Sequence, residues 1–232
     1  MNERVSNLDA IILCGGKGKR LRPITESIPK PMVEIKGQPI LSYIFSYLQS
    51  QGIKKIHAAT GYKYQIVHDY VSNYVTNMTI KTIFSGNVDI IKRIKDVGES
   101  ISGDFLVLYG DTISDVNLVQ LINFHLDTGL KATMTVWPMR SQFGLVEFDE
   151  NGKVISFLEK PVLDKYMNIG CFYFNHEILR IMDDYDDWEV FLYEMVRMGI
   201  LAAFKHDGLH ITVNTVEELS LAEKNIVSIF RG

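Results

Sequence analysis

The sequence has few cysteines, no long hydrophobic run and no excess of positive charge, and each absence excludes a class of protein. Cys14 and Cys171 lie in apolar runs and lack the spacing of a zinc knuckle or a disulfide framework, so we expect reduced, semi-buried thiols. The longest apolar runs fall far below the ~20 residues that span a bilayer. The polar N-terminus, MNERVSNLD, is unlike a signal peptide. We therefore expect a cytoplasmic protein that does not contact a membrane.

The charge balance argues against a nucleic-acid-binding protein. The chain has 24 basic and 28 acidic side chains and a net charge of −4, whereas a protein with a broad basic face would be more positive. A local phosphate pocket needs only a few cations, so it stays compatible with this balance. The 47% hydrophobic and 22% charged residues are ordinary for a globular protein and exclude disorder and coiled coil.

The first half of the chain alternates between strand patterns and helix patterns. This alternation predicts a mostly parallel sheet with helices on both faces. The predicted strands are Asp9–Cys14, Ile53–Thr60, Thr79–Phe84 and Asp104–Tyr109, and the predicted helices are Ile40–Gln51, Tyr64–Val75 and Val116–Thr128.

After Lys131 strand patterns follow one another, and no linker or internal repeat separates the two halves. The predicted strands are Ala132–Trp137, Leu145–Phe148, Val154–Glu159 and Ile169–Phe174, and the predicted helices are Glu189–Met198 and Val216–Phe230. We predict one Rossmann-like α/β domain over residues 1–232, whose second half adds antiparallel strands over one end of the sheet. Ligands of such sheets bind beyond the carboxyl ends of the strands.

The first predicted strand is followed by a loop rich in glycine and positive charge. It reads GGKGKRLRP from Gly15 to Pro23, so three glycines can bring backbone amides close to an anion and four cations can neutralise it. The loop is neither a Walker A motif nor a GxGxxG fingerprint, because Leu21 stands at the third glycine. A tight turn with solvated lysines is the alternative, but the density of cations favours phosphate binding.

Lys30 and Asp111 are two further candidate site residues. Lys30 lies between Pro29 and Pro31, which stiffen the backbone and aim the ammonium, although a surface turn with an unpaired lysine is the simpler reading of that motif alone. Asp111 ends a buried strand, where a carboxylate suits Mg²⁺. Asp115 is the better candidate to cap the next helix, which leaves Asp111 available for a metal.

The second half contributes an acid–base pair and an amide. Glu159 and Lys160 precede Pro161, and Asn168 opens the next predicted strand. A surface ion pair of little energetic consequence is the alternative for the pair. The six histidines form no triad-like or metal-like set, so we assign none of them to catalysis.

Taken in order along nearly the whole chain, these motifs resemble the sugar-nucleotide pyrophosphorylases. The motifs are LCGGKGKRLRP from Leu13, PKPMV from Pro29, Gly-Asp at Asp111, Glu-Lys-Pro at Glu159 and Asn-x-Gly at Asn168. Enzymes of that family join an NTP to a sugar 1-phosphate, and within it the chain is most similar to the glucose-1-phosphate cytidylyltransferases. The resemblance implies Mg²⁺ as cofactor, NTP (CTP favoured) and sugar 1-phosphate as substrates, and a role in nucleotide-sugar and polysaccharide biosynthesis. It leaves association into a homo-oligomer open.

The resemblance also implies a role for each matching residue. Arg20, Lys30 and Asp111 would be catalytic, and Asp111 and Asn214 would hold the metal. The nucleotide would contact Leu13, Gly15, Gly16, Gly18, Lys19, Arg20 and Gly61, and the sugar phosphate would contact Lys30, Gly144, Glu159, Lys160 and Asn168. Within the chain, residues 1–130 would form the nucleotide half and residues 131–232 the sugar-phosphate half.

The sequence departs from the family pattern at four places. Lys19 replaces a Thr or Ser, Asn214 replaces the second metal-binding Asp, and His210 replaces a Trp of the most similar members. The segment Asn87–Lys92 stands where the family carries a Thr-Gly-Gly or Gly-Thr-Ala loop. Two alternatives therefore remain: transfer of another nucleotide to a different sugar or non-sugar phosphate, or a regulatory module that binds NTP without catalysis.

Overall fold

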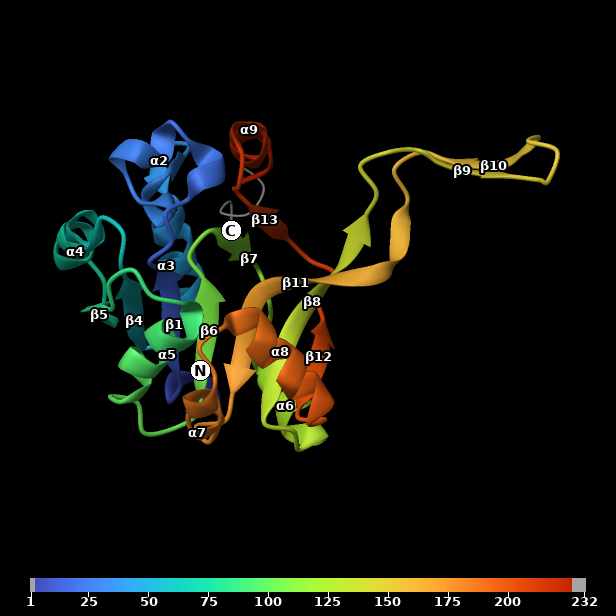
Figure 1. Cartoon of the computed structure of the whole chain (residues 1–232). Helices are drawn as coiled ribbons and strands as arrows, with labels where there is room; N and C mark the ends of the chain where they lie inside the picture. The colour runs from blue at the N-terminus through green and yellow to red at the C-terminus, as the bar shows by residue number, and fades with distance from the viewer. Residues whose placement is uncertain (1–2, 227–232) are drawn as a thin grey trace.

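A seven-stranded sheet forms the centre of the protein, and the computed structural model describes residues 3–226 (Figure 1). The strand order is β12-β8-β11-β6-β1-β4-β5, and β11 alone runs against its neighbours. The strands are β1 (Asp9–Cys14), β2 (Glu34–Ile35), β3 (Gln38–Pro39), β4 (Lys55–Thr60), β5 (Thr79–Phe84), β6 (Phe105–Tyr109), β7 (Thr112–Ser114), β8 (Ala132–Arg140), β9 (Leu145–Phe148), β10 (Val154–Leu158), β11 (Val162–Phe174), β12 (Leu201–Lys205) and β13 (His210–Thr212).

Helices cover both faces of this sheet. They are α1 (Glu3–Ser6), α2 (Ile24–Ser27), α3 (Ile40–Gln51), α4 (Tyr64–Asn73), α5 (Ile90–Gly98), α6 (Leu118–Thr128), α7 (Ile178–Ile181), α8 (Trp188–Arg197) and α9 (Val216–Asn225), with 3-10 turns η1 (Lys19–Leu21), η2 (Lys30–Met32) and η3 (Met182–Asp184). Within residues 3–226, none of the helices is long and apolar enough to cross a membrane.

Alternate side chains of the central strands feed two separate hydrophobic cores. On β1, Ile12 packs with helices α3 and α6, whereas Ile11 faces the opposite side and packs with α5, α7 and α8. The buried, uninterrupted apolar run of β1 is what a parallel strand covered on both faces requires. The prediction of a mostly parallel α/β sheet with helices on both faces and an antiparallel strand from the second half is confirmed.

The second half is arranged differently from the prediction in one respect. Strands β8, β11 and β12 extend the same sheet at one edge, and β9 and β10 pair only with each other. Figure 1 shows this hairpin projecting away from the sheet and its helices. The added strands therefore do not lie over one end of the sheet as expected. Six of the predicted elements differ from the observed ones only at their ends, by one to three residues: the strands at 53–60, 104–109, 132–137 and 154–159 and the helices at 64–75 and 189–198.

Three elements correct the sequence analysis more substantially. Strand β11 begins at Val162 instead of Ile169, because its first half pairs with the long β8. Helix α5 begins inside the segment Asn87–Lys92, where the family pattern has a loop, and continues beyond it to Gly98. The Asp89 side chain caps its first turn. Helix α6 begins at Leu118 and is capped by Asn117, whereas the Asp115 carboxylate accepts a hydrogen bond from the Leu209 amide at 2.6 Å. The predicted end of the last helix, 227–230, lies outside the described residues.

The carboxyl ends of β1 and β6 lead into the segments that carry most of the predicted site. Figure 1 shows helices α2 and α9 beyond this edge of the sheet. The small antiparallel pair β7–β13 places Thr212 opposite Thr112, so the start of α9 lies next to the end of β6. Residues 13–30, 109–111 and 214 are thereby brought to one place from three distant parts of the chain.

The buried thiols give a test of the fold. Both cysteines are unpaired in the described structure, and burial raises the pKa of Cys14 to about 12 and that of Cys171 to about 11. Because the thiolate is the reactive form, we expect neither to react with Ellman's reagent in the folded protein at neutral pH. Both should react in denaturing guanidinium chloride. Labelling of the native protein at the rate of free cysteine would contradict this placement of β1 and β11.

Candidate active site

Two glycines of the loop after β1 stand where a side chain would not fit, one for its backbone conformation and one for a close neighbour. Gly18 has φ +58°, and a Cβ there would lie 2.9 Å from Thr25 Cγ2. The Thr25 hydroxyl donates a hydrogen bond to the Gly18 carbonyl at 2.8 Å, which fastens the loop to α2. A Cβ on Gly15 would lie only 2.0 Å from the Arg93 guanidinium. The loop and Arg93 therefore pack directly against each other.

Arg93 is a buried cation that the sequence analysis did not single out. Its guanidinium donates to the carbonyls of Thr60 at 2.5 Å and of Gly86 and Val88 at 3.1 Å each. Burial lowers the pKa of this guanidinium, while Cys14, Asp96 and Asp89 act in the opposite direction. Arg93 thus joins the end of β4 to the segment before α5. The signal for this role was an arginine on the buried stripe of an amphipathic helix.

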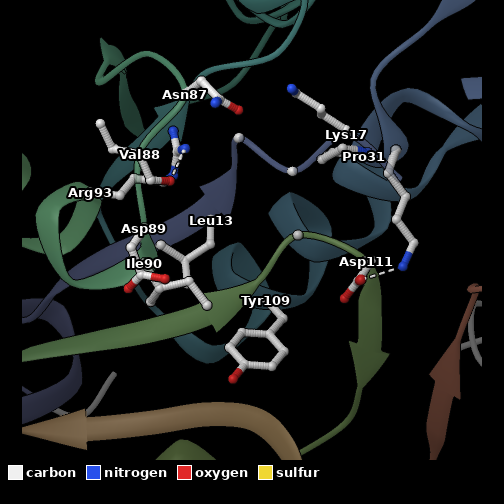
Figure 2. Close-up of a pocket in the computed structure, with 14 residues that line it drawn as sticks. Leu13, Lys17, Pro31, Asn87, Val88, Asp89, Ile90, Arg93, Tyr109 and Asp111 are labelled. Atoms are coloured by element: carbon white, nitrogen blue, oxygen red, sulfur yellow. Dashed lines mark hydrogen bonds and ion pairs between the residues drawn. The ribbon is translucent and has the colours of Figure 1, made fainter. Parts of the chain in front are cut away.

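A cavity of about 340 Å³ opens between this loop, the start of α5 and the end of β6. In Figure 2, Arg93 and Val88 lie at one end, Asp111 lies at the other, and Leu13 and Tyr109 lie between them. The lining is apolar around Leu13 and Ile90 and charged near Asp111. The cavity is lined by Leu13, Gly15, Gly16, Lys17, Lys30, Pro31, Asn87, Val88, Asp89, Ile90, Arg93, Tyr109, Gly110 and Asp111.

A second hollow, of about 260 Å³, adjoins the first and carries most of the cations. It is lined by Gly16, Gly18, Lys19, Arg20, Lys30, Asp111 and Asn214, so Gly16, Lys30 and Asp111 belong to both spaces. Three cations and one carboxylate leave it with an excess of two positive charges. An anion with several charges, such as a polyphosphate, complements this hollow.

The Lys30 ammonium is the centre of the hollow. The side chain is largely buried and forms an ion pair with Asp111, and its Nζ also donates to Asn214 Oδ1 at 2.7 Å. Arg20 Nη2 donates to the same Asn214 oxygen at 2.9 Å. Residues from three distant parts of the chain therefore meet at one point. An ammonium has three donors, and the described side chains take two of Lys30's.

Asn214 does not cap the last helix, because Thr215 does. The Thr215 hydroxyl accepts a hydrogen bond from the Glu218 amide at 3.2 Å, and the Glu218 carboxylate accepts one from the Asn214 amide at 2.5 Å. Asn214 Nδ2 donates to Thr212 Oγ1 at 3.1 Å, which turns the side-chain oxygen toward Lys30. Asn214 is therefore free of a capping role in α9, and its side-chain oxygen faces Lys30.

The oxygens of Asp111 and Asn214 converge on the place that the Lys30 ammonium takes in this structure. The described residues contain no group of three or more His, Cys, Asp and Glu side chains placed to hold a metal ion. One carboxylate and one amide oxygen fit Mg²⁺, which takes one or two carboxylates and completes its shell with phosphate and water oxygens. The site therefore fits a metal ion whose remaining ligands are phosphate and water oxygens.

The sequence-predicted site residues fall into three groups. Nine of them line one or both spaces, and Gly61 lies behind the cavity against Arg93. Asn168 lies beside Tyr109, a cavity-lining residue; burial raises the pKa of Tyr109, while hydrogen bonds to Trp188 and Asn168 act to lower it. Gly144, Glu159 and Lys160 are on the projecting hairpin or next to it and line neither space. The nine are Leu13, Gly15, Gly16, Gly18, Lys19, Arg20, Lys30, Asp111 and Asn214.

The chain is similar in sequence to bacterial sugar-phosphate nucleotidyltransferases. The glucose-1-phosphate cytidylyltransferase of Salmonella typhi is 34% identical over 239 residues, which cover 91% of this chain and 93% of that protein. The D-glycero-alpha-D-manno-heptose 1-phosphate guanylyltransferase of Campylobacter jejuni is 37% identical over 156 residues, 66% of this chain and 69% of that protein.

The fold and the family follow from two further comparisons. The crystal structure of HddC from Yersinia pseudotuberculosis superimposes with a TM-score of 0.74 at 25% identity, covering 94% of this chain and 99% of that one. The family model described as nucleotidyl transferase matches residues 9–206, which include the glycine loop, Lys30, Asp111 and the hairpin. The chain therefore belongs to the nucleotidyl transferase family.

Proposed function

We propose that this protein transfers a nucleotidyl group from an NTP, with CTP favoured, to a sugar 1-phosphate and releases pyrophosphate. One observation carries the proposal: the buried Lys30 ammonium, paired with Asp111, stands where an elongated cavity meets a hollow with excess positive charge. The cavity has the size and the partly apolar lining for a base and ribose, and the hollow suits a triphosphate. The cytidylyltransferase relative aligns over most of this chain and supports CTP.

The family resemblance supplies a role for each of these residues in the proposal. Leu13, Gly15 and Gly16 contact the base and ribose, while Gly18, Lys19 and Arg20 hold the triphosphate. Lys30 contacts the α-phosphate. Residues 1–130 thus supply the nucleotide half of a single domain, and residues 131–232 supply the sugar-phosphate half through Asn168, Gly144, Glu159 and Lys160.

The reaction proceeds by in-line attack of a sugar-phosphate oxygen on the α-phosphorus, with pyrophosphate leaving from the opposite side. A phosphate monoester is largely ionised at neutral pH, because its second pKa is about 6, so no side chain has to act as general base. The chain contributes orientation and charge stabilisation. Arg20 and Lys30 neutralise the negative charge that develops on the transferred and leaving phosphates.

Asp111 and Asn214 hold Mg²⁺ in this proposal. The ion supplies additional positive charge to the phosphate oxygens when it is bound. Asp111 and Asn214 would hold the ion with the same oxygens that accept from the Lys30 ammonium in this structure, and Lys30 would then be free to turn toward the α-phosphate.

A guanylyltransferase is the second candidate, and the Campylobacter relative is the observation that favours it. The end of the cavity where the base would lie is formed by the segment Asn87–Ile90, at the start of α5. A module that binds NTP without transfer would also accommodate the cavity, but it would form no pyrophosphate.

A coupled assay separates these candidates. Purified protein is incubated with each of the four NTPs, a panel of sugar 1-phosphates and inorganic pyrophosphatase, and phosphate is measured with malachite green. We expect phosphate release with CTP and a hexose 1-phosphate. Release with GTP alone would favour the guanylyltransferase. Nucleotide binding measured by calorimetry without release in any combination would identify the module and refute transfer.

Arg20 provides the first mutational test of the phosphate-binding hollow. Its one hydrogen bond between described side chains goes to Asn214, so Arg20→Ala should leave the thermal unfolding curve unchanged. Removing a charge-assisted contact to phosphate costs about 1.5–3 kcal/mol, so kcat/KM should fall roughly 10- to 150-fold. Arg22→Ala is the matched control, because Arg22 is also exposed but lines neither space. Wild-type kcat/KM in Arg20→Ala would remove this residue from the site.

Asn214 tests how the metal is held. The cluster of Arg20, Lys30 and Asp111 has one excess positive charge, which opposes binding of Mg²⁺ to the free protein. Asn214→Asp adds a carboxylate at the same place and cancels that charge, so it should tighten Mg²⁺ binding measured by calorimetry without nucleotide. The size-matched control is Asn117→Asp, at the cap of α6 and away from the site. Equal Mg²⁺ affinity of wild type and Asn214→Asp would show that residue 214 does not face the ion.

A further inference from the structure

The carboxylate of Asp89 has one oxygen that no described residue engages. Its Oδ1 accepts a hydrogen bond from the Ile91 amide at 3.1 Å and so caps α5, whereas within residues 3–226 no group donates to Oδ2 and no ion pair includes this side chain. The Arg93 guanidinium feels the charge of Asp89 but donates to backbone carbonyls. Asp89 is exposed and lines the cavity, so Oδ2 is available to a ligand.

The position of the cations decides which part of a nucleotide Asp89 would meet. The positively charged hollow adjoins the cavity at Asp111 and takes the phosphates in the proposed function, so the base extends to the other end. Figure 2 shows Asp89 at that end, together with Val88 and Arg93. Val88 and Ile90 give this part of the cavity an apolar lining, in which the free oxygen of Asp89 is a hydrogen-bond acceptor.

We propose that Asp89 Oδ2 accepts a hydrogen bond from an exocyclic amino group of the base, and that the protein thereby selects CTP over UTP and dTTP. A carboxylate can only accept, and the N4 amino group of cytosine donates to it. Uracil and thymine carry the O4 carbonyl oxygen at that position, which would face the carboxylate oxygen without a proton between them. The inference rests on the proposed function for the placement of the base. Guanine also carries an amino group, so the exclusion of UTP and dTTP holds for both candidate transferases.

The carboxylate is fixed before a nucleotide binds. Besides the cap at Ile91, the Asp89 carbonyl accepts a hydrogen bond from the Arg93 amide at 3.2 Å, and the Arg93 guanidinium holds the preceding Val88 carbonyl at 3.1 Å. A preorganised acceptor discriminates strongly, because a base without the matching donor leaves it unpaired. One hydrogen bond to a charged group corresponds to roughly tenfold or more in affinity.

Calorimetry of nucleotide binding without sugar phosphate tests this assignment. Wild type should bind CTP roughly tenfold more tightly than UTP. In Asp89→Asn the amide oxygen can still cap α5, since Asn and Asp are equally good caps, and the amide nitrogen replaces Oδ2 with a donor. We therefore expect the ratio of the two affinities to fall to one or to reverse in favour of UTP, with an unchanged thermal unfolding curve.

Asp187→Asn is the matched control. Asp187 caps α8 in the same way, through the Val190 amide at 2.9 Å, and lines neither space, so this variant should keep the wild-type ratio. Equal affinities for CTP and UTP in wild type, or the wild-type ratio in Asp89→Asn, would show that Asp89 is a helix cap only and overturn the proposal.

The coupled pyrophosphate assay separates this inference from the proposed function. Turnover with equal kcat/KM for CTP and UTP would leave nucleotidyl transfer in place and refute base selection by Asp89. Selective binding of CTP that is lost in Asp89→Asn, without pyrophosphate from any NTP, would refute transfer and leave the role of Asp89 established. Wild-type protein that binds no nucleotide would overturn both.

Discussion

The structure of the site depends on one buried cation that two neighbours hold. Lys30 retains only 11% of its side-chain exposure, and its ammonium would be costly to bury without Asp111. Its ion pair links η2 to the end of β6, and its bond to Asn214 links both to the start of α9. Removing either acceptor would leave a buried donor unsatisfied and would separate segments that are far apart in sequence. The same contact that organises the fold at this edge thus organises the positively charged hollow.

A second buried cation has a different task. The hydrogen bonds of Arg93 go to backbone carbonyls in the described structure, so it fixes the chain around the cavity. Gly15 is required because the guanidinium takes the space of a side chain at that position. The shape of the cavity end near Asn87 and Val88 is consequently a property of this arginine as much as of the residues themselves.

The sequence predicted those features that neighbouring residues in the chain determine. The buried run before Gly15 identified β1, because its apolar pattern is local. Pro29 and Pro31 allowed an aimed Lys30, but that motif alone favoured a surface turn with an unpaired lysine. Helix α5 had a readable cap at Asp89 and apolar residues at Ile91 and Ile94, but Arg93 breaks that apolar stripe. The meeting of Lys30 with Asn214 could not be predicted from either segment, since it requires the pairing of β7 with β13.

The position of the β9–β10 hairpin could not be predicted from motifs along the chain. Glu159 and Lys160 are recognisable because of Pro161, yet the motif contains nothing that fixes where the hairpin lies relative to Lys30. The hairpin joins the sheet only through the strands at its base, and neither Glu159 nor Lys160 lines either of the two spaces. The spaces around Lys30 are assembled by contacts within the described chain, among them the Lys30–Asp111 pair, and Asn168 lies beside the cavity-lining Tyr109. Local motifs identified residues of the hairpin but not their distance from Lys30, because that distance is set by the long paired strands β8 and β11, which carry the hairpin away from the sheet (Figure 1).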